Sequence, residues 1–199
     1  MNPRADRAAS LAVLGFCAIL PLFTVGDSGR LSLGRATPFS VARMQRDLDS
    51  ILALGPRPMG SEAARKTAAY IQEQLEAVGL RVHIQEFETP PPPGMTDENA
   101  DKPESRIRIQ NGRIRGRNLW ATLPTEVRYT RCGVILSGHY DTKNMRKFIG
   151  AVDGGSSTIL LLELARVLRE NPFHSLPVSL LFFDGEEAFT QAWAPFGRY

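Results

Sequence analysis

Three apolar segments in the second half of the chain constrain its fold more than any other feature. Residues 133–137 and 177–183 are short apolar runs of strand length, and residues 158–168 between them form a longer, strongly apolar run. A strand, a helix and a second strand in this order predict two parallel strands joined by a crossover helix that packs on the sheet. We therefore expect an α/β fold built on an open sheet.

The first half of the chain adds two amphipathic helices. Residues 40–54 have helical spacing of their apolar side chains, and residues 55–60, with two prolines and two glycines, must end that helix. Ser61 can cap a second helix that ends at Gly79. The apolar faces consist of Val41, Met44, Leu48, Ile51 and Leu52 in the first helix, and Ala64, Ala68, Ile71, Leu75 and Val78 in the second.

Alternating patterns between these helices and the apolar segments predict paired strands. Residues 80–85 alternate between apolar and polar side chains, as in a half-buried strand. His83 falls on the polar side of this strand, which favours a solvated histidine over a ligand. Asn111 and Gly112 stand between two alternating runs and predict a two-residue hairpin turn.

Charge and cysteine content exclude two classes of function. The net charge of +3 is too small to indicate a polyanionic partner. The densest basic stretch, residues 106–117, alternates with isoleucines and has no interleaved aromatic platform, so we expect no nucleic-acid binding. The two cysteines are Cys17 and Cys132, and Cys17 lies in an N-terminal apolar run. The mature part is therefore expected to hold neither an internal disulfide nor a cysteine-based zinc site.

The N-terminus has the pattern of an export segment. Arg4 and Arg7 precede an apolar run over residues 11–25, and polar residues follow it. A run of about fifteen residues is short for a full membrane span, and a buried helix is the alternative. We expect residues 1–30 to be a signal peptide or an N-terminal membrane anchor, and residues 31–199 to be the N-terminal part of a catalytic domain. The protein would then be periplasmic, secreted or membrane-anchored, with membrane contact through this segment only.

Three polar clusters interrupt the apolar segments where chemistry is expected. They are residues 138–141 after the first strand, residues 150–155 before the crossover helix, and residues 183–187 after the second strand. Loops at the carboxyl ends of neighbouring parallel strands meet in one crevice. The clusters therefore predict that four side chains lie near one another: His139, Asp153, Glu186 and Glu187.

Imidazole and carboxylate groups in this mixture suit a zinc ion. Of two adjacent glutamates, one can face the metal while the other moves a proton beside it. Asp141 can accept the N–H of the His139 ring and so fix its tautomer. Each residue also has a structural alternative: Asp153 as a helix cap, the glutamates as first-turn carboxylates, and His139 with Asp141 as a polar pair. Convergence of all three clusters favours the metal site.

The same clusters resemble the M28-type zinc exopeptidase superfamily, whose pattern is His-x-Asp, Gly-Ala-x-Asp before a helix, then Glu-Glu. Within it the chain looks closest to the glutaminyl-peptide cyclotransferases. Their His-Tyr-Asp-Ser-Lys motif is matched by residues 139–143, with Thr142 in place of serine. Their Phe-Phe-Asp-Gly-Glu-Glu-Ala-Phe motif is matched without a difference by residues 182–189. Trp193 would supply the tryptophan that follows it, one residue later than in the animal cyclases.

This resemblance implies a fold, a cofactor and a set of roles. The fold is a three-layer αβα arrangement with a mostly parallel mixed sheet, incomplete at its C-terminus. The substrates are peptide or protein N-termini, and the reaction converts N-terminal glutamine to pyroglutamate with release of ammonia. The implied zinc ligands are Asp153 and Glu187, the acid/base is Glu186, and the surrounding or pocket residues are His139, Asp141, Lys143 and Trp193.

Departures from the family pattern leave two rival functions open. Gly154 after Asp153, and Ala188 and Phe189 after the glutamates, stand where the aminopeptidases have other residues, which favours the cyclase over a zinc aminopeptidase. The late histidine ligand of the family has no counterpart, because His174 precedes Glu187 in a connector. We infer a fragment that binds zinc weakly and has little activity on its own. A non-catalytic exported domain is the second rival.

Overall fold

The computed structural model describes residues 37–93, 95, 107–124, 133–145, 147–170, 176–187 and 189. Expectations for the N-terminal segment, for Cys132 and His174, and for Trp193 lie outside these residues. The helices and strands of the described residues follow the chain in the order α2 (Val41–Leu52), α3 (Glu62–Ala77), β1 (Val82–Thr89), β2 (Ile109–Gln110), β3 (Arg113–Thr122), β4 (Val134–His139), α5 (Gly155–Glu170) and β5 (Val178–Phe183). Among these helices, none has both the length and the apolar character needed to cross a membrane.

The strands form one mixed sheet in the order β1-β3-β5-β4, with β2 paired to β3. Strands β4 and β5 are parallel, and α5 is the connection between them, as the apolar segments predict. The pairs β1–β3, β2–β3 and β3–β5 are antiparallel. The α/β class with a mixed sheet is thus confirmed, and the parallel pairing is the one that carries the polar clusters.

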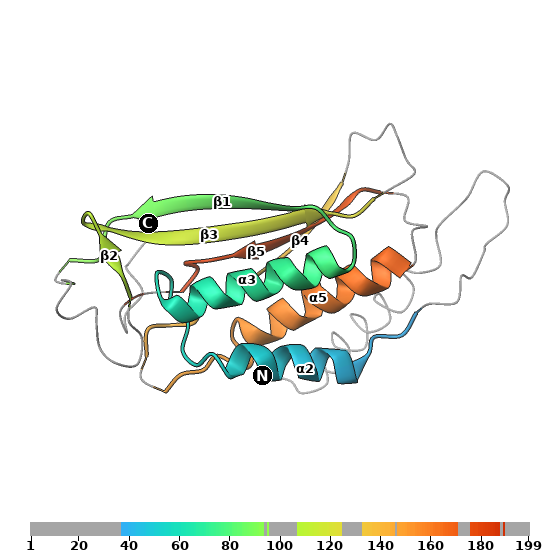
Figure 1. Ribbon diagram of the computed structural model, residues 1–199, viewed down its shortest axis with the longest axis horizontal. Helices are drawn as coiled ribbons and strands as arrows, with labels where there is room; N and C mark the ends of the chain where they lie inside the picture. The colour runs from blue at the N-terminus through green and yellow to red at the C-terminus, as the bar shows by residue number, and fades with distance from the viewer. Residues whose placement is uncertain are drawn as a thin grey trace, which may run out of the picture. The chain divides into compact units, whose positions relative to one another are not determined.

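The described helices all lie on one side of this sheet (Figure 1). Helix α3 packs on β1 and β3, α5 packs on β4 and β5, and α2 packs on α5. Leu119 and Ala121 of β3 and Leu180 and Phe182 of β5 are fully buried beneath the helices. A helical layer on the opposite face is not among the described residues.

Capping residues near the ends of the first two helices agree with the sequence prediction. Ser40 caps α2 and Ser61 caps α3, each through a side-chain oxygen that accepts a backbone N–H three residues ahead. Gly79, with φ of 77°, follows the end of α3 in the left-handed region that glycine adopts readily. Helix α5 begins at Gly155, three residues before the start that the apolar run predicted.

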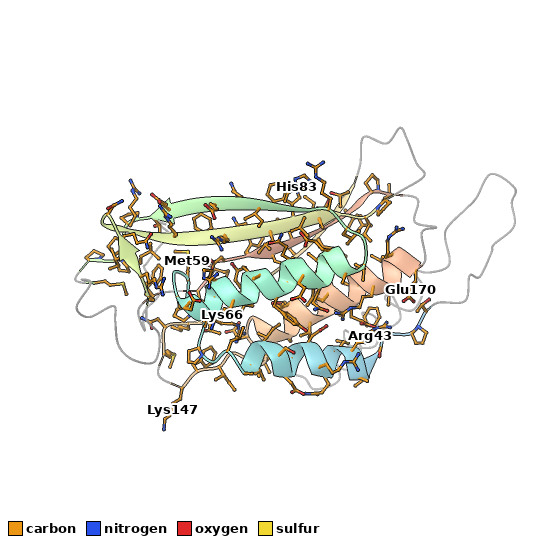
Figure 2. The ribbon with its side chains drawn as sticks, in the orientation of Figure 1. Arg43, Met59, Lys66, His83, Lys147 and Glu170 are labelled. Atoms are coloured by element: carbon orange, nitrogen blue, oxygen red, sulfur yellow. The ribbon has the colours of Figure 1, made fainter. Side chains whose placement is uncertain are left out.

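The hairpin between β2 and β3 also forms where it was expected. Asn111 and Gly112 have φ of 53° and 70°, and a tight hairpin turn of this type requires positive φ at both central residues. Strand β1 continues to Thr89, beyond the predicted residue 85, because it pairs with β3 along its whole length. His83 is exposed on β1 (Figure 2). Its ring stacks on Trp120, with ring centroids 5.2 Å apart.

A buried carboxylate joins the helices, and the apolar pattern of α5 did not reveal it. Glu163 is 0% exposed. Its oxygens accept hydrogen bonds from the Ser40 backbone N–H at 2.6 Å and from the Arg43 guanidinium at 2.7 and 3.0 Å (Figure 2 shows Arg43 on α2). Burial by itself raises the pKa of Glu163, but these hydrogen bonds outweigh it and hold the pKa below its ordinary value. Arg166 extends the network to Asp47 of α2.

Candidate functional site

The three polar clusters meet where β4 and β5 end. His139 is the last residue of β4 and pairs in register with Phe183, the last residue of β5. The start of α5 lies against the same edge, because Ser157 donates a hydrogen bond to the His139 carbonyl at 3.0 Å. A Cβ atom at Gly138 would lie 2.6 Å from the Ser157 Cβ, so only glycine permits this approach. Chain geometry thus brings the loop that precedes α5 next to both strand ends.

His139 lies among carboxylates contributed by all three clusters. Its Nε2 is 3.2 Å from Asp153 Oδ1, and its Nδ1 is 3.4 Å from Asp141 Oδ1 and 3.9 Å from Glu186 Oε2. Asp141 is the main cause that raises the pKa of His139 to about 9, and burial opposes it. Among the described residues, the buried Nδ1 has no hydrogen-bond partner of good geometry. The surrounding carboxylates thus favour the protonated form of the imidazole.

Asp141 holds the turn that carries the two glutamates. Its side chain is 1% exposed, and its two oxygens accept the backbone N–H groups of Glu186 at 3.3 Å and Glu187 at 3.1 Å. The sequence predicted that Asp141 supports the ring of His139, and Asp141 does face that ring. Its hydrogen bonds, however, go to the opposite cluster. Asp141 therefore couples the end of β4 to the turn after β5.

Glu187 and Asp153 bring two carboxyl groups together. Glu187 is buried, whereas the Asp153 side chain is 56% exposed. Burial first, and then the hydrogen bond and charge of Asp153, raise the pKa of Glu187 to about 7. Two neighbouring carboxylates repel each other unless a proton or a cation lies between them. The pair therefore has the character of a cation site.

Imidazole and carboxylate atoms of this site can reach a single ion. Among the described residues, one ligand atom each from His139, Glu186 and Glu187 lie within 4.8 Å of one another. Asp153 adjoins this group through its contact with His139 Nε2. The structure therefore collects all four residues that the strand order predicted to converge. The geometric cluster includes His139, which the family resemblance places beside the metal rather than on it.

The remaining predicted site residues are less informative. Lys143 is half-buried two residues beyond Asp141, and Trp193 lies outside the described residues.

Asp184 is adjacent to the two glutamates in sequence but has a different partner. It accepts a hydrogen bond from the Arg117 backbone N–H at 3.0 Å. Burial raises the pKa of Asp184 to about 8, and the nearby charge of Asp141 adds to this effect.

One residue of the site region was missed by the sequence analysis. Arg57 lies in the glycine- and proline-rich segment that ends α2, and it is 0% exposed. Its Nε donates a hydrogen bond to the carbonyl of Tyr140, between His139 and Asp141. A charged residue in a short loop normally predicts solvent exposure. The sequence pattern around Arg57 contains no signal of its burial.

Comparisons with known proteins agree with this geometry. Residues 118–193 match Peptidase family M28. A glutaminyl-peptide cyclotransferase of Drosophila melanogaster is 33% identical over 159 residues, which cover 76% of this chain and 38% of that protein.

Solved structures share the fold. A glutaminyl cyclase from an Acidobacteriales bacterium is 28% identical, with a TM-score of 0.62 and coverage of 82% of this chain and 50% of that one. A leucine aminopeptidase precursor from Bacteroides thetaiotaomicron has a TM-score of 0.61 at 21% identity, with coverage of 81% and 53%. The chain thus spans between 38% and 53% of the length of these proteins.

Proposed function

We propose, from the premise that this chain belongs to the M28 family and is related to the glutaminyl-peptide cyclotransferases, that the complete protein cyclises N-terminal glutamine. The products would be a pyroglutamyl peptide and ammonia. The observation that carries the proposal is the turn after β5, where the adjacent Glu186 and Glu187 lie against His139 and Asp153. One glutamate is exposed to a substrate and the other is buried, which divides the two between proton transfer and metal binding.

The described residues fit a zinc ion. Nitrogen and oxygen donors suit zinc, and catalytic zinc sites keep one position open beside their protein ligands. Asp153 and Glu187 would hold the ion, because their converging carboxyl groups are the pair most in need of a positive charge. His139 would orient Asp153 from the far side through its Nε2. Zinc, when bound, supplies a Lewis acid that polarises the carbonyl of the glutamine side chain.

Glu186 is the group that moves protons in this proposal. The α-amine nitrogen of the substrate attacks the side-chain carbonyl carbon of the same glutamine, and a five-membered ring forms. Glu186 accepts a proton from that amine and returns it to the departing nitrogen, so that the carbon–nitrogen bond breaks and ammonia leaves. Its side chain is 51% exposed, which leaves it accessible to a peptide N-terminus. Asp141 holds the Glu186 backbone in place during both transfers.

A zinc aminopeptidase is the second candidate, and the position of His139 favours it. In that reaction Glu186 would instead take a proton from a water molecule, and His139 would serve as a ligand, as its place in the 4.8 Å cluster allows. Both reactions need a base next to the metal, so a substitution at Glu186 does not separate them. Substrate choice separates them.

The complete protein is expected to act on a peptide that begins with glutamine and to leave a peptide that begins with leucine unchanged. A cyclase uses two groups of one residue, so the product keeps every residue and loses only ammonia. Mass spectrometry of both peptides after incubation distinguishes this product from a shortened peptide. Release of the first residue from either peptide would establish the aminopeptidase and reject the cyclase.

We also propose that the protein is exported, on the basis of Arg4, Arg7 and the apolar run over residues 11–25. The expected result of cell fractionation is that the complete protein is found outside the cytoplasm or in the membrane fraction. Recovery from the soluble cytoplasmic fraction with residues 1–25 still attached would contradict this proposal.

A further inference from the structure

Arg57 is a buried cation whose side chain donates hydrogen bonds to three backbone carbonyls. Its Nε donates to the Tyr140 carbonyl at 2.8 Å, Nη1 to the Ile149 carbonyl at 2.6 Å, and Nη2 to the Gly150 carbonyl at 2.9 Å. These acceptors lie 83 to 93 residues away in sequence. A buried guanidinium is costly unless its donors are satisfied, and here all three of its nitrogen atoms donate to the chain.

The carbonyls that Arg57 binds belong to two of the three clusters of the site, at Tyr140 and Gly150, and to Ile149, which directly precedes the second cluster. Tyr140 lies between His139 and Asp141, and Ile149 and Gly150 begin the loop that leads to Asp153. The backbone of Arg57 strengthens the first of these contacts, since its N–H donates to Thr142 Oγ1 at 2.9 Å and its carbonyl accepts the Thr142 N–H at 3.2 Å.

Packing around Gly150 shows how closely this loop follows the arginine. Gly150 has φ of 55°, and a Cβ atom there would lie 2.5 Å from the Thr142 methyl group and 2.6 Å from the Asp153 carbonyl oxygen. The loop therefore lies in close contact with the segment after β4. Arg57, in the loop between α2 and α3, contacts both segments through its hydrogen bonds.

The third cluster, residues 183–187, is linked to Arg57 indirectly, through the charge of Asp141. Burial lowers the pKa of Arg57 to about 10, and Asp141 is the nearby group that opposes this shift. Arg57 is thus still a cation at neutral pH, and it compensates the buried Asp141. Asp141 in turn accepts the backbone N–H groups of Glu186 and Glu187. One side chain consequently stabilises the segments that carry all four site residues.

We propose that Arg57 is a positioning residue that sets the distance between the proton-transfer group and the metal ligands. Arginine suits this task because its planar guanidinium carries five N–H donors in fixed directions. A lysine ammonium is a point charge on a flexible stem and cannot reach three divergent carbonyls at once. The inference rests on the proposed function, in that the ion to be bound is zinc and the substrate is a glutamine-initiated peptide.

Arg57→Lys in the complete protein tests the proposal, with Arg166→Lys as the matched control. Arg166 is also a poorly exposed arginine, but it pairs with Asp47 and Glu163 between the helices, away from the site. We expect Arg57→Lys to raise the zinc Kd about 10- to 100-fold, as loss of a residue that orients metal ligands does. We expect kcat to fall while the KM for the peptide stays within about twofold. Arg166→Lys should lower the midpoint of urea unfolding without changing the zinc Kd.

A zinc Kd and kcat that remain within about twofold in Arg57→Lys would overturn the proposal and leave Arg57 a structural residue. If Arg57→Lys does not fold, Thr142→Val decides, because it removes one hydrogen bond to the Arg57 backbone. An increase in zinc Kd of about threefold to tenfold, the equivalent of one hydrogen bond, supports the proposal, and no change overturns it.

Hydrogen exchange of the metal-free protein separates this inference from the proposed function. Loss of protection at the Glu186 and Glu187 amides in Arg57→Lys, but not in Arg166→Lys, supports positioning whether or not zinc is the ion. Wild-type protein that binds no zinc would overturn the proposed function alone. Unchanged protection of these two amides would overturn the positioning role.

Discussion

Glu186→Gln is expected to lower kcat for pyroglutamate formation by about a thousandfold, within the range that a positioned acid/base contributes. The amide has the size of the carboxylate but cannot take a proton from the α-amine. Because the Glu186 side chain is 51% exposed, its replacement should leave the unfolding midpoint unchanged. Initial rates with a glutamine-initiated peptide, measured on zinc-loaded protein, provide the test.

Zinc content is the control for this experiment. Glu186→Gln should bind zinc as the wild type does, since Asp153 and Glu187 remain. A variant that keeps more than about a tenth of the wild-type rate would show that another group transfers the proton. His139 is then the nearest alternative, with Nδ1 3.9 Å from Glu186 Oε2.

Glu187→Gln, unlike Glu186→Gln, should weaken zinc binding, on the order of a hundredfold or more. This is about the share that one ligand contributes to the binding free energy.

The zinc affinity of the wild type should also depend on pH. The pKa of Glu187 is raised to about 7 without metal, so the group is protonated below that pH and must release its proton to the ion. Zinc affinity is therefore expected to fall about tenfold per pH unit below about pH 7.

Competition with a chelator from about pH 5 to pH 8 measures this dependence. Glu186→Gln is the matched control, because it changes the adjacent carboxylate and should keep the slope of the pH dependence, shifted only slightly to lower pH by the loss of the smallest contribution to the raised pKa of Glu187. A zinc affinity that is independent of pH below 7, or that survives Glu187→Gln, would remove Glu187 from the set of ligands.

Features of the fold that depend on local chemistry could be predicted from the sequence. The apolar run of α5 shows its burial directly, and the Asn111–Gly112 turn follows from the need for positive φ at both positions. The convergence of the site also followed, because the parallel order of β4 and β5 places the residues after both strands at one edge. What these residues do chemically is still a prediction.

Features that depend on distant partners could not be predicted. The length of β1 is determined by its pairing with β3, not by its own alternation. A glutamate in an apolar helix is normally expected on the surface. Glu163 is buried because its charge is compensated by Arg43, which is 120 residues away in sequence. Arg57 is the strongest case, because its acceptors are backbone carbonyls, which no residue type identifies.

The four residues from Gly138 to Asp141 form a compact motif in sequence, yet each serves a different neighbour. Gly138 gives room to Ser157 of α5, His139 faces the site, and the Tyr140 hydroxyl donates to the Arg117 carbonyl at 2.8 Å. Asp141 holds the turn after β5. A protein engineer who transplants the motif alone onto another sheet would move the imidazole without the surfaces that orient it. The smallest transferable unit also includes the start of α5, the middle of β3, the turn after β5 and the segment around Arg57.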